Sequence, residues 1–201
     1  MPSFGLKTSI IGGRTDDRQT VPLITLETAR LRIVPLDRAS FDEKRHAPAD
    51  DPMFGTEEFR EAMDELAERA AHDRKTRFAW YTNRLIYRKE DGAYVGSIAF
   101  MNSPEKDPDH VGLIEIGYAT EEAYRGQGYM TEAVSAMTEW ALSQPKVYGL
   151  IAGVQDGNPA SDRVLEKCGF VKTDHSDALS LSVWKYIPRG RKKMTFLQRF
   201  F

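Results

Sequence analysis

The stretch from Leu113 to Leu142, LIEIGYATEEAYRGQGYMTEAVSAMTEWAL, constrains the fold more than any other part of the chain. It begins with an apolar, β-rich run that Gly117 interrupts, and a glycine inside a strand often marks a bulge or the close approach of a ligand. Further along, apolar residues recur at three- and four-residue intervals, as on one helix face: Met130, Ala133, Val134, Met137, Trp140 and Ala141. The stretch therefore predicts a strand, a glycine-rich turn and a helix.

The turn, Arg125-Gly126-Gln127-Gly128, has two interpretations. Its glycines can simply relieve steric crowding. Alternatively, the turn presents free backbone N–H groups at the positive end of the helix dipole, which is where a phosphate binds. The sequence contains neither GxxxxGK[ST] nor a GxGxxG motif with an acidic residue about twenty positions later, so the two common nucleotide-binding loops are excluded.

The turn resembles the acyl-CoA loop of the GNAT acetyltransferases, which reads Gln or Arg, two residues, Gly, one residue, then Gly or Ala. Arg125, Gly128 and Met130 occupy the three defined positions, and Met130 departs from the small residue of the pattern. A second stretch, NPASDRVLEKCGF over residues 158–170, resembles the later motif of that family. The matching residues are Asn158, Ser161, Leu165, Glu166, Lys167, Gly169 and Phe170.

The resemblance implies a GNAT fold, acetyl-CoA as cosubstrate and an amine as acceptor. The turn and its flanks would hold the cofactor, together with a strand that opens and offers an unpaired N–H to the thioester carbonyl. Asn158 would hydrogen-bond the pantetheine arm. The expected cofactor-binding residues are Ile116, Gly117, Tyr118, Arg125, Gly126, Gln127, Gly128, Tyr129, Met130 and Asn158.

Two residues are candidates for catalysis. Glu115 lies on the strand from which GNAT enzymes often draw a general base, acting directly or through a water; it can equally be a surface-facing acid. Ser161 is placed by the resemblance near the sulfur, where its hydroxyl could protonate the thiolate, or it can cap a helix. Core packing is the expected role of Tyr118, Tyr124 and Tyr129, although their hydroxyls lie near the same region.

Other reactive side chains do not form a recognisable site. Cys168 has no histidine nearby in the sequence, so we interpret it as a small buried apolar residue. The four histidines, His46, His72, His110 and His175, lack metal-ligand spacing, and no metal site is predicted. His46 and His72 could line an acceptor pocket, but surface positions are the expectation.

The composition bounds the remaining possibilities. A chain of 201 residues can bury one domain core, and its formal charge of -2 gives no reason to expect nucleic acid or an anionic membrane as a partner. No apolar run reaches the length of a membrane span, and a single cysteine fits a reducing compartment. We expect a cytoplasmic protein whose oligomeric state stays open, a homodimer included.

The elements along the chain alternate between strands and helices. Residues 1–22 are expected to be a flexible arm, 23–187 the acetyltransferase domain, and 188–201 a basic tail. The predicted strands cover 24–36, 78–88, 93–101, 113–118, 147–155, 170–172 and 180–186, and the helices cover 37–45, 56–74, 129–142 and 160–168. This order is typical of an α+β (α/β-like) domain with a mixed central sheet flanked by helices.

The opening of the domain carries a further likeness. Thr28, Arg30 and Leu31 resemble the Thr-x-Arg-Leu phrase of the GNAT branch that modifies protein N-termini and similar amines. The leading hypothesis is therefore an acetyl-CoA-dependent N-acetyltransferase acting by direct transfer to a primary amine. A catalytically silent GNAT-fold module that binds or senses acyl-CoA stays open as the alternative, as does a protein-interaction role for the tail.

Overall fold

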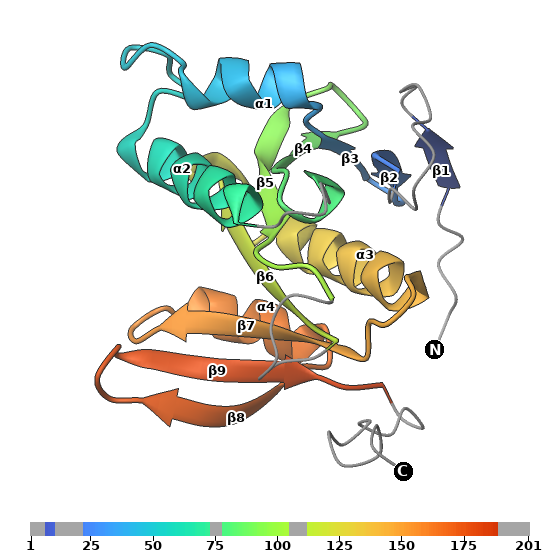
Figure 1. Cartoon of the computed structure of the whole chain (residues 1–201), viewed down its shortest axis with the longest axis vertical. Helices are drawn as coiled ribbons and strands as arrows, with labels where there is room; N and C mark the ends of the chain where they lie inside the picture. The colour runs from blue at the N-terminus through green and yellow to red at the C-terminus, as the bar shows by residue number, and fades with distance from the viewer. Residues whose placement is uncertain (1–6, 11–21, 73–77, 105–111, 189–201) are drawn as a thin grey trace.

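The computed structural model describes residues 7–10, 22–72, 78–104 and 112–188, and these build a single nine-stranded sheet (Figure 1). Across the sheet the strands follow the order β1-β2-β3-β4-β5-β6-β7-β9-β8. Their bounds are β1 (Lys7–Ile10), β2 (Ile24–Glu27), β3 (Leu31–Pro35), β4 (Arg84–Arg88), β5 (Tyr94–Phe100), β6 (Leu113–Thr120), β7 (Gly149–Gln155), β8 (Val171–Ser176) and β9 (Leu181–Tyr186). Among the strands that the structure describes, β6 and β7 are the only pair that runs in parallel, which confirms the mixed sheet.

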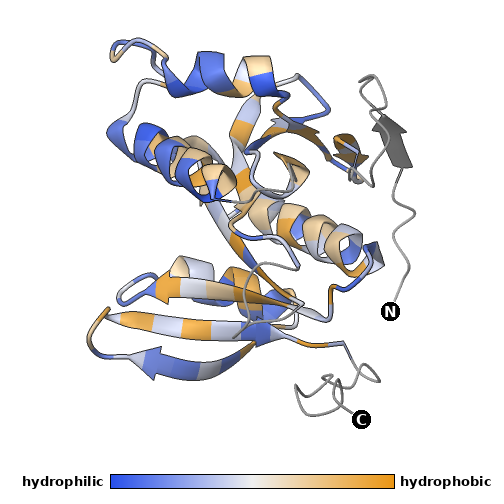
Figure 2. Cartoon of the chain, in the orientation of Figure 1, coloured by the Kyte–Doolittle hydropathy of each residue, from blue (hydrophilic) through white to orange (hydrophobic). Residues whose placement is uncertain are grey.

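Helices cover both faces of this sheet. Their bounds are α1 (Arg38–Arg45), α2 (Glu57–Ala71), α3 (Tyr129–Ser143) and α4 (Pro159–Lys167), with short 3-10 turns η1 (Phe78–Trp80) and η2 (Glu122–Tyr124). Apolar residues of α1 and α2 pack in one cluster against Leu85 and Ala99, and those of α3 and α4 pack in another against Ile114 and Ile116. Alternate residues of the strands therefore face different helix pairs, and Figure 2 shows the apolar sides of the helices turned inward.

The starts of α1 and α2, which lie between β3 and β4 in the chain, are each within one residue of the predicted helix starts. The Asp37 carboxylate accepts a hydrogen bond from the Ser40 N–H at the start of α1. The Thr56 hydroxyl accepts one from the Phe59 N–H at the start of α2. Both residues are N-caps, because each side chain satisfies a donor that the first turn leaves unpaired.

Two predicted strands have a different structure. The segment 24–36 is a hairpin, β2 and β3, which turns at residues 28–30, and β1 adds an unpredicted strand inside the expected arm. The segment 78–88 begins with η1, and only Arg84–Arg88 is a strand. The Arg84 guanidinium is buried and donates hydrogen bonds to the carbonyls of Ala79 and Thr82. These bonds stabilise the tight turn around η1, which is why this part of the segment is not an extended strand.

The sheet opens between its two parallel strands. β6 and β7 pair over three residues each, Leu113–Glu115 with Gly149–Ile151, and then part (Figure 1). β6 stays paired with β5 as far as Thr120, while β7 stays paired with β9 as far as Gln155. The carboxyl ends of two parallel strands thus diverge, and a crevice at such ends is where open α/β sheets bind ligands.

Candidate functional site

Two helices begin beside the split between β6 and β7. β6 leads through η2 and the glycine turn into α3, and β7 leads through a short turn into α4. The site predicted from the two sequence motifs therefore gathers at one place, because each motif supplies the turn and helix start that follow one of the diverging strands.

The backbone of β6 determines which groups face the split. Both main-chain groups of Glu115 point toward the β5 side, where its carbonyl accepts from Met101 N–H and its N–H donates to Asn102 Oδ1. Gly117 points the same way, since backbone groups alternate along a strand, and it pairs with Ala99. The N–H of Tyr118 faces the opposite side, beyond the last residue pair with β7.

Of the two interpretations of Gly117, a bulge or the close approach of a ligand, the bulge is wrong. The register between β5 and β6 runs without a shift from Ile116 to Thr120. A shift lies instead between β4 and β5, where Gly96 has a φ of 152° and a Cβ on it would stand 2.2 Å from the Ala119 carbonyl oxygen. The strand opens because β7 turns away, and no inserted residue in β6 is needed.

The glycine turn holds an open conformation. Gly126 and Gly128 have φ angles of 75° and 79°, which favour glycine, and a Cβ on Gly126 would meet no atom within 4 Å. Gly128 is the N-cap of α3 and offers no side chain to the first turn. None of the described residues accepts a hydrogen bond from the N–H groups of residues 126–131, so these donors are unpaired within the described part of the protein.

Side chains around the turn leave that open face clear. Arg125 Nε donates back to the Thr120 carbonyl at 3.2 Å, and Gln127 Nε2 donates to the Ala123 carbonyl at 2.9 Å. Met130, which departs from the small residue of the family pattern, is buried in the core with Tyr129. Its side chain therefore lies behind the turn, and the departure does not narrow the open face.

The start of α4 is closed by its own cap. Asn158 Oδ1 accepts from the Ser161 N–H at 3.1 Å, and Pro159 occupies the first turn, where a missing N–H costs nothing. The N-cap of α4 is therefore Asn158, whereas one of the two sequence hypotheses gave this role to Ser161. The Ser161 hydroxyl is not the cap, and it is a hydrogen-bond partner of the Tyr118 phenol.

Tyr118 bridges the two sides of the split. Its hydroxyl donates to the Ser161 carbonyl at 3.3 Å, so β6 contacts the first turn of α4. Burial raises the pKa of the Tyr118 phenol to about 12, and the bond at Ser161 offsets only part of this. The phenol therefore stays protonated over the whole neutral range.

The Glu115 carboxylate lies on the face covered by α1 and α2. Its Oε2 accepts from Arg69 Nη1 of α2 at 3.1 Å, and both side chains are 36% exposed. Burial opposes the charge of Arg69, but its hydrogen bonds with Glu65 and Glu115 outweigh burial and raise the pKa of the guanidinium. Arg69 was not predicted, because its partner is 46 residues away and no local pattern joins them.

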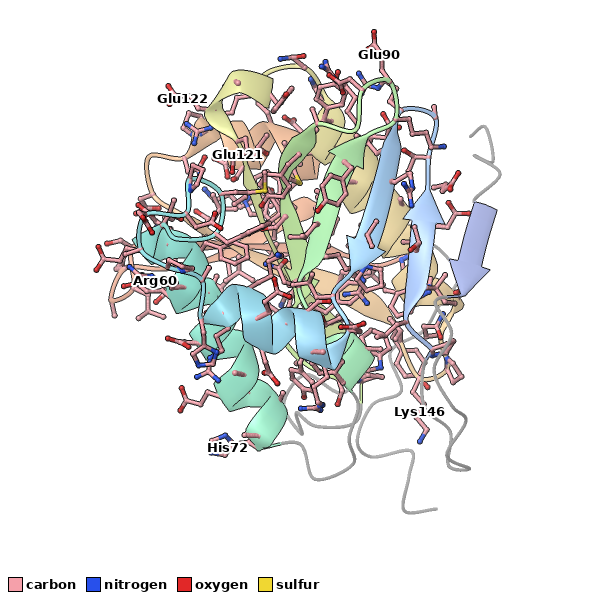
Figure 3. The ribbon with its side chains drawn as sticks, turned by 90° about the horizontal axis from the view of Figure 1, so that it is seen from above. Arg60, His72, Glu90, Glu121, Glu122 and Lys146 are labelled. Atoms are coloured by element: carbon pink, nitrogen blue, oxygen red, sulfur yellow. The ribbon has the colours of Figure 1, made fainter. Side chains whose placement is uncertain are left out.

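The remaining reactive side chains serve structure. Cys168 Sγ contacts the Thr131 carbonyl at 3.3 Å, and burial raises the pKa of this thiol, so it links α4 to α3 as a neutral group. His46 and His72 each contact a carbonyl of their own helix, and His72 points away from the body of the protein (Figure 3). His175 lies between Asp156 and Asp177 on the surface, and His110 is outside the described residues.

Comparisons with known proteins bear directly on this arrangement. The family model of the acetyltransferase (GNAT) domain matches residues 30–171. The uncharacterized N-acetyltransferase YjdG of Bacillus subtilis (strain 168) is 30% identical over 176 residues, covering 83% of this chain and 100% of that protein.

Solved structures share the fold at lower identity. An acetyltransferase from Agrobacterium tumefaciens str. C58 has a TM-score of 0.58 at 23% identity, covering 88% of this chain and 100% of that one. RimL, a ribosomal L7/L12 alpha-N-protein acetyltransferase in complex with coenzyme A, has a TM-score of 0.54 at 16% identity, covering 80% of this chain and 95% of that one. At these identities the likeness shows the fold alone.

Proposed function

Because the chain belongs to the GNAT acetyltransferase family and is an acetyl-CoA-dependent N-acyltransferase, we propose that it transfers an acetyl group directly to a primary amine, either a protein N-terminus or a small amine. The observation that carries this proposal is the split between β6 and β7, which has an uncapped helix start on one side and, on the other, the Asn158 Nδ2 group, which has no partner among the described residues. A long, flexible thioester, whose pantetheine arm is joined to its adenosine by a diphosphate, fits such a site.

In this proposal the glycine turn binds the diphosphate. The N–H groups of residues 126–131 supply hydrogen-bond donors without acceptors, and the α3 dipole favours negative charge at the same place. The pantetheine arm then follows the split, where Asn158 Nδ2 has no partner among the described residues and can donate to it.

The N–H of Tyr118 is the donor proposed for the thioester carbonyl, since it faces the split just beyond the residues that pair. A donor held by the strand stabilises the negative charge that develops on the carbonyl oxygen as the amine attacks. Gly117 cannot take this role, because its N–H points to β5.

The proposed chemistry moves two protons. The amine nitrogen attacks the carbonyl carbon, a C–N bond forms, and the C–S bond then breaks. Glu115 accepts the proton that the nitrogen loses, directly or through a water. Ser161 donates a proton to the departing sulfur, and solvent then reprotonates Ser161. The carboxylate fits this role because Oε1 has no hydrogen-bond partner among the described residues, whereas Oε2 is held by Arg69.

The acceptor class rests on two supports. The Thr28-x-Arg30-Leu31 phrase resembles the branch that modifies protein N-termini, and RimL, which shares the fold, acts on a ribosomal protein. On the face of α1 and α2, Glu65 and Glu115 supply carboxylates that would attract a protonated amine before it binds.

The test is a turnover panel. Acetyl-CoA is mixed with peptides bearing free N-termini, a polyamine, an amino acid and an aminoglycoside, and thiol release is followed for each. We expect thiol release with at least one amine and none with N-blocked peptides. Tight CoA binding without thiol release from any acceptor would favour the silent acyl-CoA-binding module instead.

A further inference from the structure

The β2–β3 hairpin is anchored to the start of α3, more than 100 residues later in the chain. The anchor point is Glu132 in the first turn of α3. Its Oε1 accepts from the Thr28 hydroxyl at 2.5 Å and from the Arg30 N–H at 2.8 Å, while Oε2 accepts from Arg30 Nε at 2.7 Å. One carboxylate therefore joins the tip of a hairpin to the helix that carries the glycine turn.

Arg30 also reaches into the turn itself. Its Nη1 donates to the Gln127 carbonyl at 3.1 Å, and its guanidinium lies 4.5 Å over the Tyr129 ring. A Cβ on Gly128 would stand 3.6 Å from Nη2, so the side chain lies against the turn from behind. A single arginine thus contacts three consecutive residues of the turn and the first helical turn that follows.

The contact at Gln127 fixes the direction of a donor. A trans peptide is planar, and its C=O and N–H groups point in opposite directions. Because the Gln127 carbonyl points at Arg30, the Gly128 N–H of the same peptide points away from the hairpin, toward the open face. The hydrogen bond to Arg30 therefore orients one of the donors proposed to bind the diphosphate.

The charge of Glu132 would otherwise disfavour an anion beside it. Burial opposes ionisation of this carboxyl, but the hydrogen bonds from Thr28 and Arg30 outweigh burial and lower its pKa. The side chain is 19% exposed, and its negative charge is matched by Arg30. Because Arg30 compensates the charge of Glu132, this carboxylate can anchor the hairpin without repelling a phosphate from the start of α3.

We propose that Arg30, with Thr28 and Glu132, is a positioning residue for the diphosphate of the acyl-CoA. This inference rests on the proposed function, because the three residues would position the turn that is proposed to bind the diphosphate. It predicts that loss of the anchor weakens binding at the diphosphate and leaves the chemical step intact, since none of the three side chains reaches Glu115 or Ser161.

The test is a double-mutant cycle measured by calorimetry with CoA. We expect about tenfold weaker binding for both Arg30→Ala and Glu132→Gln, and a double variant no weaker than the worse single, as for two residues that act as one unit. Arg30→Lys should also bind weakly, because a point-like ammonium cannot hold Glu132 and the Gln127 carbonyl together. KM for acetyl-CoA should rise while kcat stays unchanged.

The matched control is Arg45→Ala, which removes an arginine from an ion pair between α1 and α2 and should leave CoA affinity unchanged. Failure of wild-type protein to bind CoA would overturn the proposed function itself. If wild type binds CoA, then wild-type affinity in Arg30→Ala, tighter binding in Glu132→Gln, or additive single effects would each overturn the anchor.

Discussion

The helices α3 and α4 both begin beside the split between β6 and β7, but α3 has no side-chain cap and α4 has one. α3 begins at Gly128, without a side-chain cap, and its first donors are open. α4 begins at Asn158, whose side chain satisfies one donor, followed by Pro159, which has none. In the proposed function this difference places the diphosphate of the cosubstrate at α3 and its uncharged arm at α4, because the α3 start has more unpaired backbone donors among the described residues.

The support behind the two starts differs as well. At α3 the β2–β3 hairpin holds the helix start, because Arg30 and Thr28 donate hydrogen bonds to Glu132 in its first turn. At α4 the contacts are Tyr118 from β6 and Trp184, whose indole N–H donates to Asp162 at 3.0 Å. The α3 start is thus held by polar and charged groups of the hairpin, whereas the α4 start is held by hydrogen bonds from a tyrosine and a tryptophan.

The largest effect should come from the strand between the two starts. Glu115→Gln removes the proposed base but leaves both helix starts as they are. We expect turnover to fall by roughly a hundred- to ten-thousandfold. CoA affinity should be nearly unchanged. Turnover within a few-fold of wild type would leave Glu115 as a partner of Arg69 only.

Ser161 and Asn158 separate chemistry from capping at α4. Ser161→Ala should lower turnover without lowering the melting temperature, because Asn158 is the cap. Asn158→Ala should instead reduce the free energy of unfolding by about 1 kcal/mol. Steady-state rates and thermal melts of both variants make the test, and wild-type turnover in a folded Ser161→Ala protein would remove the serine from the mechanism.

Gly128→Val addresses the open start of α3. A β-branched residue at a φ of 79° is strained by roughly 1–2 kcal/mol, so the turn should leave the conformation that directs its N–H groups outward. We expect about tenfold weaker CoA binding, equivalent to about 1.4 kcal/mol. Gly92→Val, at a φ of 73° in the β4–β5 turn, is the control for strain and should bind CoA normally. Equal affinities in the two variants would contradict the assignment.

The smallest effects should appear at opposite ends of the pH scale. The pKa of Glu132 is lowered, so its share of stability is present at neutral pH and is lost as the pH falls below its usual value of 4.5. The pKa of Tyr118 is raised to about 12, so its share is lost as the pH rises above 10. Glu132→Gln should flatten only the acid side of the unfolding free energy, and Tyr118→Phe only the alkaline side.

Local patterns predicted most of this arrangement. Helix periodicity, strand patterns and the two family motifs indicated the elements and the order in which they meet. Asn158 and Ser161 were both found, but which one caps depends on the backbone angle at the helix start, and both residue types favour caps. The hairpin turn within 24–36 was missed because residues 27–30 include no Gly, Pro, Asn or Asp, the usual turn residues, although the apolar positions change there from even (Ile24, Leu26) to odd (Leu31, Ile33) numbers.

Long-range pairs lay beyond such patterns. Arg30 and Glu132 are 102 residues apart, and each is an ordinary charged surface residue in its own segment. Glu115 and Arg69 meet only because β6 and α2 pack together. The Thr28-x-Arg30 phrase was the single sequence signal available, and it indicated a family branch without indicating the contact.

The central claim is that the open start of α3 binds the diphosphate. Backbone amide NMR during titration with CoA, and separately with pantetheine, tests it most directly. We expect CoA to shift the amides of residues 126–131 and those at the start of α4, and pantetheine to shift only the latter. Unshifted amides at residues 126–131 in protein saturated with CoA would contradict the account.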